Sequence, residues 1–133
     1  MTAEEGAAGA VRVLLADDDE SFLASIQPLI EQQPELSVVG TASDGLAAIE
    51  LADELLPDAV VIDIHMPLLD GVTAVARLRR DHANLCLVAL TGDRHEEIHR
   101  AVLEAGADAV LMKGELVDTL FERLQAVKDS TRS

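Results

Sequence analysis

The amino-acid sequence predicts a single α/β domain in which α-helices cover both faces of a five-stranded parallel β-sheet. The chain has 133 residues, of which 49% are hydrophobic, and this is ample for one buried core. Five short apolar runs alternate with five segments of helical periodicity. Such alternation is typical of parallel sheets whose strands are joined by right-handed helical crossovers.

The five predicted strands are runs rich in valine, isoleucine and leucine. They lie at 11–16, 36–41, 59–64, 85–91 and 108–112. Continuous apolar runs of this length, rather than runs that alternate with polar residues, indicate strands that are buried on both faces.

The five predicted helices carry apolar residues three and four positions apart. They lie around 22–30, 46–52, 72–78, 98–105 and 116–124. Asp44 and Asp70 stand where N-terminal caps are expected, and Gly106 stands at a C-terminal cap. Pro28 lies inside the first helix and removes a backbone donor there. We expect a local kink rather than a break, because the apolar pattern continues beyond it.

The domain is expected to span residues 11–127, with flexible tails at 1–10 and 128–133, where no apolar periodicity is seen. The sequence contains no apolar run of about 18 residues and no leader-like start. Its one cysteine, Cys86, has no second cysteine with which to form a disulfide. These features predict a cytoplasmic chain without membrane insertion.

The formal net charge of -15 limits the partners that the chain can have. A strongly acidic surface is repelled by nucleic-acid phosphates and by anionic lipid. Direct binding to DNA is therefore not expected, nor is attraction to an anionic membrane surface. Most of this charge is explained by a solvated surface that favours solubility.

Carboxylates follow two of the predicted strands. The first strand runs into Asp17, Asp18, Asp19 and Glu20, and the third contains Asp63 near its end. The carboxyl ends of parallel strands meet at one edge of a sheet, so these groups are expected to converge there. Crowded carboxylates need a cation, and Mg²⁺ suits such a site. Helix capping is the alternative for Asp17 and Asp18, and it is the expected role of Asp19 and Glu20.

Two other strand ends carry groups that complement an anion. The fourth strand ends in Thr91 and Gly92, and the fifth ends in Lys113. Lys113 can pair with Asp63 and then with a phosphoryl oxygen, and the Thr91 hydroxyl can donate to another oxygen. Gly92 leaves space for an incoming group. Each residue alone is unremarkable, and the indication comes from their joint occurrence at the ends of four strands.

Residues 11–127 resemble the receiver domain of response regulators in two-component signalling. The resemblance is carried by four segments in the order and approximate spacing of that family. They are VLLADDD at 13–19, VVIDIHMPLLDG at 60–71, ALTG at 89–92 and LMK at 111–113.

The resemblance implies a flavodoxin-like, doubly wound sheet with strand order 2-1-3-4-5 and five helices. It implies that Asp63 is the phosphoacceptor, that Asp17 and Asp18 are metal carboxylates, and that the His65 backbone carbonyl is a further Mg²⁺ ligand. By the same resemblance, Thr91 is the switch hydroxyl and Lys113 is the partner of the phosphate.

The function implied by the resemblance is that of a signalling switch, not of an enzyme with an external substrate. The chain takes phosphate from a sensor histidine kinase or a phosphotransfer protein, and it loses it slowly by itself. The family then reshapes the surface around its fourth helix, fifth strand and fifth helix, here about residues 94 to 128. The output passes to a downstream protein or to a homodimer.

The sequence departs from the family pattern at two positions. Val110 replaces the aromatic residue that often lies three positions before the lysine, and Gly114 replaces a proline that often follows it. The usual coupling of the threonine to an aromatic ring is therefore in doubt. His65 and Asp93 flank the route of the attacking water in the family and are expected to set the lifetime of the phosphate, although Asp93 also suits a helix N-cap.

Two other functions remain as alternatives. A degenerate receiver would act as a protein-interaction module without phosphorylation, but the acidic set is complete. A Mg²⁺-dependent aspartyl phosphohydrolase would use an Asp-x-Asp motif, and Asp17 and Asp19 have that spacing. Such an enzyme also needs a cap insertion, for which the chain has no room. Nucleotide binding is disfavoured because the first strand leads into acids rather than into a glycine-rich loop.

Overall fold

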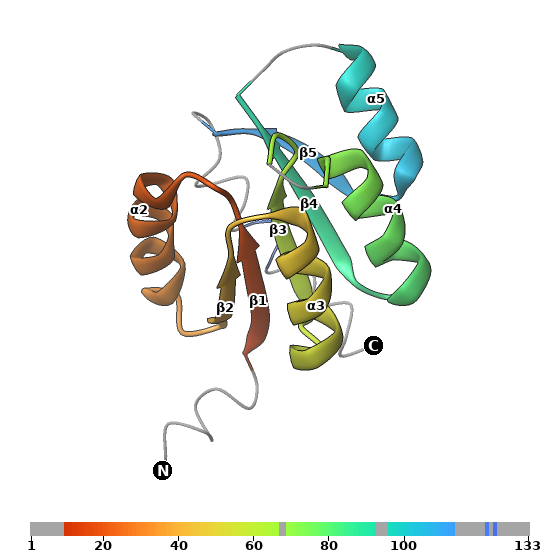
Figure 1. Cartoon of the computed structure of the whole chain (residues 1–133). Helices are drawn as coiled ribbons and strands as arrows, with labels where there is room; N and C mark the ends of the chain where they lie inside the picture. Colours follow the sequence, from red (N-terminus) through yellow and green to blue (C-terminus); the bar gives the residue numbers. More distant parts are fainter. Residues whose placement is uncertain (1–9, 67–68, 93–95, 114–121, 123, 125–133) are drawn as a thin grey trace.

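Strands and helices alternate along the chain, as Figure 1 shows. The computed structural model describes residues 10–66, 69–92, 96–113, 122 and 124. The strands are β1 (Val11–Ala16), β2 (Leu36–Ala42), β3 (Ala59–Asp63), β4 (Cys86–Thr91) and β5 (Ala109–Met112). The helices are α2 (Glu20–Glu31), α3 (Gly45–Leu55), α4 (Gly71–Asp81) and α5 (Glu96–Ala105).

The strands form one parallel sheet in the order β2-β1-β3-β4-β5. This confirms the predicted fold class and strand order. Four of the five predicted helices fall within the described residues. The fifth was expected around 116–124, where only two residues are described, and one of them, Leu124, is fully buried. The predicted tails lie outside the described residues except for Ala10.

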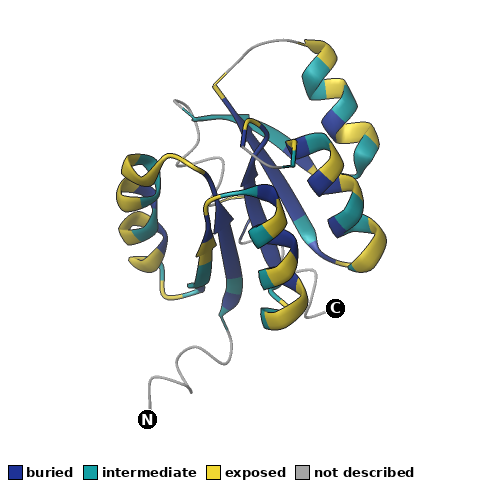
Figure 2. Ribbon diagram, in the orientation of Figure 1, coloured by how far each residue is buried: buried dark blue, intermediate teal, exposed yellow. Residues whose placement is uncertain are grey.

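Each central strand sends alternate side chains to two separate cores. One core, here called the α2 face, joins Val13, Val61 and Leu90 to Ile26 and Ile30 of α2. The other, the three-helix face, joins the intervening strand residues to α3, α4 and α5. In Figure 2 the three central strands β1, β3 and β4 are buried, the edge strands β2 and β5 are mostly intermediate, and the outer sides of the helices are exposed. The burial on both faces predicted from the continuous apolar runs is confirmed for the three central strands, whereas the two edge strands are only partly covered.

Three helices begin at an aspartate whose side chain accepts a backbone N–H three residues later. These N-caps are Asp19, Asp44 and Asp70, as predicted, and Asp93 lies outside the described residues. Helix α2 continues past Pro28 to Glu31, so the proline does not break it. Gly106 follows α5 with φ of +127°, which confirms its place as a terminating glycine because other residues rarely adopt that angle.

Gly71 is required by a close approach rather than by a turn. A Cβ atom at this position would lie 2.3 Å from the Cα atom of Ile64. The Gly71 N–H donates to the Ile64 carbonyl at 3.2 Å. The glycine therefore lets the start of α4 lie directly against the chain that leaves β3.

The amino-terminal edge of the sheet is closed by two aspartates. Asp58 precedes β3 and Asp108 precedes β5. The Asp58 carboxylate accepts the Arg12 N–H at 2.9 Å, and the Asp58 N–H donates to the Arg12 carbonyl at 2.8 Å. Asp108 makes the same reciprocal pair with Leu87, at 2.8 and 2.7 Å. Each aspartate thus extends the sheet by one more pair of hydrogen bonds.

Arg79 connects the carboxyl end of α4 to two loops. Its guanidinium group donates to the carbonyls of Gly106, Ala83 and Leu85 at 2.7 to 2.9 Å. A fourth bond, of 2.9 Å, reaches the Asp108 carboxylate. Five donors in a rigid plane suit such a task, which a lysine cannot perform.

No helix among the described residues combines the length and apolar character needed to cross a lipid bilayer.

We predict that Arg79→Ala lowers the free energy of unfolding by about 2 to 4 kcal/mol, because it leaves several carbonyl groups without their donor. Among the described residues, the neighbouring Arg80 pairs with exposed Asp81, and Arg80→Ala should change stability by less than about 0.5 kcal/mol. Urea denaturation of both variants measures the difference. Equal losses would show that the Arg79 contacts do not hold the loops together.

Candidate functional site

The alternation of the strands brings three charged side chains to the carboxyl edge of the α2 face. Ala16 pairs with Ile62, so the next residues, Asp17 and Asp63, stand level on neighbouring strands. Val13, Leu15 and Val61 lie in the α2 core, and residues two positions further on point the same way. Lys113 lies two positions after Leu111, which packs against this same core. The register of the sheet thus predicts one common pocket.

Both aspartates bend back onto their own backbone. The Oδ1 atom of Asp17 accepts the Asp19 N–H at 2.9 Å, and the Oδ1 atom of Asp63 accepts the His65 N–H at 3.1 Å. A side chain that bonds the amide two residues later forms an Asx-turn, which fixes its orientation. In both residues the Oδ2 atom is left to face the pocket.

Lys113 bridges the two free oxygens. Its Nζ atom lies 2.7 Å from Asp17 Oδ2 and 3.3 Å from Asp63 Oδ2. Both carboxylates are almost fully buried, while 24% of the Lys113 side chain is exposed. The sequence-based prediction that Lys113 approaches Asp63 matches this geometry, and its shorter contact with Asp17 was not foreseen.

The pocket has too little positive charge for its carboxylates. Burial raises the pKa of Asp17 above its ordinary 3.8, and repulsion by Asp63 adds to the rise, although Lys113 and the Asp19 amide act against it. For Lys113, burial acts to lower the pKa, but the bond to Asp17 and the attraction of Asp63 outweigh it, and the pKa is raised above 10.5. Both directions favour one more positive charge in the pocket.

Three carboxylates meet at the pocket. One oxygen from each of Asp17, Asp18 and Asp63 lies within 4.8 Å of the others. Asp18 is exposed, whereas Asp17 and Asp63 are buried. The Asp17 Oδ2 atom is buried, and the Lys113 ammonium group lies 2.7 Å from it. Buried carboxylates whose charge is only partly offset by one ammonium group and a set of only oxygen ligands both fit a hard divalent cation.

Thr91 is fully buried at the end of β4. Leu90, which precedes it, pairs with Asp63, so Thr91 is adjacent to the pocket. However, Thr91 has the same alternation as Ala89 and Leu87, which belong to the three-helix face. The threonine therefore neighbours the aspartates along the sheet edge, and the alternation of β4 predicts that its side chain is directed to the other face. A Cβ atom added to exposed Gly92 would meet nothing within 4 Å, so space is open there as expected.

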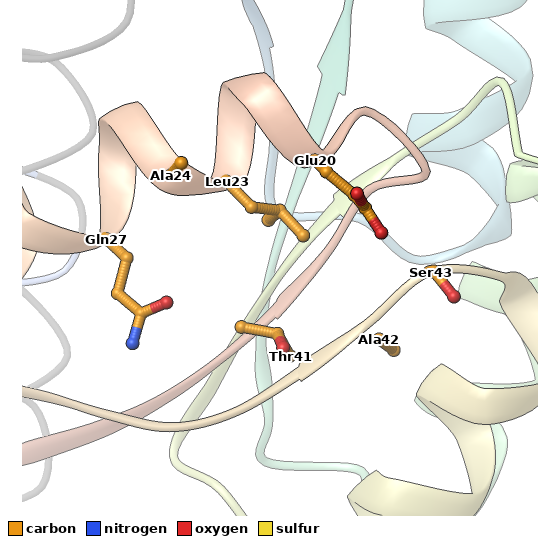
Figure 3. A pocket seen from close by; sticks show the side chains of 7 residues that line it. All are labelled: Glu20, Leu23, Ala24, Gln27, Thr41, Ala42 and Ser43. Carbon is orange, nitrogen blue, oxygen red and sulfur yellow. The ribbon is translucent and has the colours of Figure 1, made fainter.

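A groove lies between α2 and the end of β2 (Figure 3). It has a volume of about 410 Å³. Glu20, Leu23 and Gln27 line one side, and Thr41 and Ser43 line the other. None of the predicted site residues contributes to its lining. The aspartate pocket is therefore a site at the sheet edge and not part of this groove.

A family model described as the response regulator receiver domain matches residues 13–125. The chain belongs to this family. The receiver domain is 33% identical over 116 residues to the transcriptional regulatory protein LiaR of Bacillus subtilis. This match covers 87% of this chain and 55% of LiaR. It is 41% identical over 118 residues to the transcriptional regulatory protein PrrA of Mycobacterium leprae. This second match covers 87% of this chain and 49% of PrrA.

Among solved structures, this receiver domain resembles the isolated REC domain of RcsB from Salmonella enterica serovar Typhimurium in the presence of phosphomimetic BeF3-. The TM-score is 0.82 at 27% identity, and the match covers 90% of this chain and 89% of that one. The chain spans about half the length of the curated relatives it matches.

A second contact of Lys113 was also missed by the sequence analysis. The Lys113 Nζ atom lies over the ring of Phe22, 4.8 Å from its centroid. Phe22 had been assigned only to the apolar stripe of the first helix. The available signal was its position five residues after Asp17, which places it in the first turn of the helix that starts at the pocket. Val110, which stands three positions before Lys113 where the sequence departs from the family pattern, packs against the three-helix core.

We predict that Lys113→Met lowers the free energy of unfolding by about 2 kcal/mol, between the values typical of exposed and of buried ion pairs. The reason is that Asp17 and Asp63 then face each other without a cation. The chain's other lysine provides the control, since Lys128→Met makes the same change in net charge. Chemical denaturation without divalent ions measures both. An unchanged midpoint in Lys113→Met would contradict the bridging role.

Proposed function

We propose that this receiver domain is a phosphorylation switch that accepts a phosphoryl group on Asp63 in a Mg²⁺-dependent reaction. The observation that carries this proposal is the pocket in which three carboxylates from two strand ends meet a bridging lysine. The relatives named above are transcriptional regulatory proteins, and the similar RcsB domain was solved with a phosphomimetic. Both facts support a regulatory role.

The Mg²⁺ ligands in this proposal are Asp17, Asp18, Asp63 and the backbone carbonyl of His65. When bound, the ion would neutralise negative charge on phosphoryl oxygens and help to orient them. Asp17 Oδ2 is suited to a metal contact because it is buried close to a second carboxylate and its charge is only partly offset by Lys113. The His65 N–H bond to Asp63 holds the turn that carries the carbonyl.

Asp63 supplies the attacking oxygen. Its Oδ1 atom is held by the His65 N–H, which leaves Oδ2 as the nucleophile. A bond forms between this oxygen and phosphorus while the bond from phosphorus to the donor breaks. With a phosphohistidine donor, the electron pair stays on the imidazole nitrogen, which then takes a proton. The acyl phosphate carries more negative charge than the carboxylate did, and Lys113 lies close enough to pair with it.

Thr91 is proposed to supply the switch hydroxyl. Because the alternation of β4 directs its side chain to the three-helix face, a bond to a phosphoryl oxygen requires it to turn toward Asp63. Such a movement would change the connection that leads into α5 (Glu96–Ala105). In this proposal, the surface around α5 and β5 then reports phosphorylation to a downstream protein or to a second copy of the chain.

The phosphoryl donor is proposed to be a sensor histidine kinase or a phosphotransfer protein. The chain is proposed to act in the cytoplasm. The net charge of -15 argues against direct nucleic-acid binding by this chain itself. Since the chain spans about half of its curated relatives, the transcriptional activity that their names give concerns those proteins. A signalling switch, and not an enzyme with a separate substrate, is the proposal for this chain.

We expect acetyl phosphate with Mg²⁺ to add one acid-labile phosphoryl group to the wild-type chain. Asp63→Asn should add none, because the nucleophilic oxygen is gone. Asp81→Asn is the matched control, since Asp81 is exposed on α4 and its loss should leave the reaction unchanged. Intact-mass measurement shows the result. A phosphorylated Asp63→Asn variant, or an unreactive wild type, would count against the proposal.

We also expect Mg²⁺ to raise the melting temperature of the wild-type chain, because an ion that binds only the folded pocket stabilises it. Asp18→Ala should weaken this response. Asp19→Ala should lower the melting temperature through loss of the N-cap of α2 but keep the response to Mg²⁺. Calorimetry with and without the ion distinguishes the two neighbours. The same Mg²⁺ response in Asp18→Ala and wild type would contradict the ligand role of Asp18.

A further inference from the structure

Aromatic rings are scarce in this chain, and one of them lies at the pocket. The sequence has two phenylalanines, no tyrosine and no tryptophan. Phe22 is half-buried in the first turn of α2 and packs against the α2 core. Its backbone N–H donates to Asp19 at 3.1 Å, so the N-cap fixes the turn that carries the ring.

The Lys113 ammonium group has three neighbours that attract it. Two are the Oδ2 atoms of Asp17 and Asp63, and the third is the ring of Phe22, at 4.8 Å from Nζ to the centroid. A cation within about 6 Å of a ring face is attracted by the negative potential of that face. An aliphatic side chain at position 22 would fill the space but would not attract the charge.

The ring also restricts where the ammonium group can go. The chain of Lys113 has four rotatable carbon bonds, and part of it is exposed, so the two carboxylates alone would compete with water for it. The ring covers one side of the group and is fixed to a helix whose cap lies next to Asp17. Lys113 is thus held at the pocket before any phosphoryl group arrives, which is the condition for rapid electrostatic stabilisation.

We propose that Phe22 is a positioning residue, whose ring holds the Lys113 ammonium group between Asp17 and Asp63. This inference rests on the proposed function of Asp63 as phosphoacceptor. In this role Phe22 acts through Lys113. In a chain with Val110 at the position where relatives often carry an aromatic residue, α2 supplies a ring to the pocket from the opposite side of the sheet.

The first test compares rates of phosphorylation by acetyl phosphate with Mg²⁺. Phe22→Leu should slow the reaction by about two- to fivefold, the loss expected for one cation–π contact. Phe22→Tyr keeps a ring and should restore most of the rate. Ile26→Val is the matched control for packing, because Ile26 is buried one turn further along the same side of α2. Equal rates in wild type and Phe22→Leu, or equal slowing in Ile26→Val, would overturn the proposal.

The second test observes the position of Lys113 directly, without phosphorylation. The only lysines are Lys113 and Lys128, so labelling with ¹³C-lysine gives two sets of signals, which Lys113→Arg assigns. The ring should shift the signal of the Lys113 methylene next to the ammonium group, and Phe22→Leu should remove this shift while Phe22→Tyr keeps it.

The two tests separate this inference from the proposed function. An unphosphorylated wild type with the ring-dependent Lys113 signal would remove the proposed function and support the placement of the ammonium group by Phe22. A phosphorylated wild type whose Lys113 signal is the same in Phe22→Leu would keep the proposed function and overturn the positioning role.

Discussion

Two carboxylates stand level with each other because the pairing of β1 (Val11–Ala16) with β3 (Ala59–Asp63) leaves them no alternative. The same register aligns the apolar side chains of both cores, and a shift by one residue would turn every one of them to the wrong face. The repulsion between Asp17 and Asp63 is therefore fixed by the packing of the whole domain. It can be relieved only locally, by Lys113 and by a cation, and this makes the pocket responsive to added charge.

The two edges of the sheet differ in how well their charges are satisfied. At the amino edge, Asp58 and Asp108 accept backbone N–H groups and extend the sheet. At the carboxyl edge, the buried Asp17 and Asp63 carboxylates share the ammonium group of Lys113. The hydrogen bonds of Asp58 and Asp108 thus support the sheet at the edge away from the pocket. This division allows the carboxyl edge to keep an unfavourable arrangement of charges without loss of the fold.

The sequence predicted the features that depend on local pattern. Apolar runs located every strand to within one residue at each end; β5, for example, begins at Ala109 rather than at Asp108, whose side chain accepts the Leu87 N–H. The convergence of Asp17 with Asp63 followed from the geometry of parallel sheets, while the strand order came from family resemblance. The contact of Arg79 with Gly106 and the contact of Phe22 with Lys113 were missed. The partners are 27 and 91 residues apart in the sequence, and such separations leave no periodic signal.

The bonds from Arg79 to Gly106 and Asp108 hold the connection between α5 (Glu96–Ala105) and β5 in place. The opposite end of this helix follows β4 and the connection next to Thr91. A helix of ten residues is about 15 Å long, and Ile98 and Val102 pack it against the three-helix core. A displacement beside the pocket would therefore reach the end of the helix near Glu96 first, while the end near Gly106 stays anchored at the amino edge of the sheet.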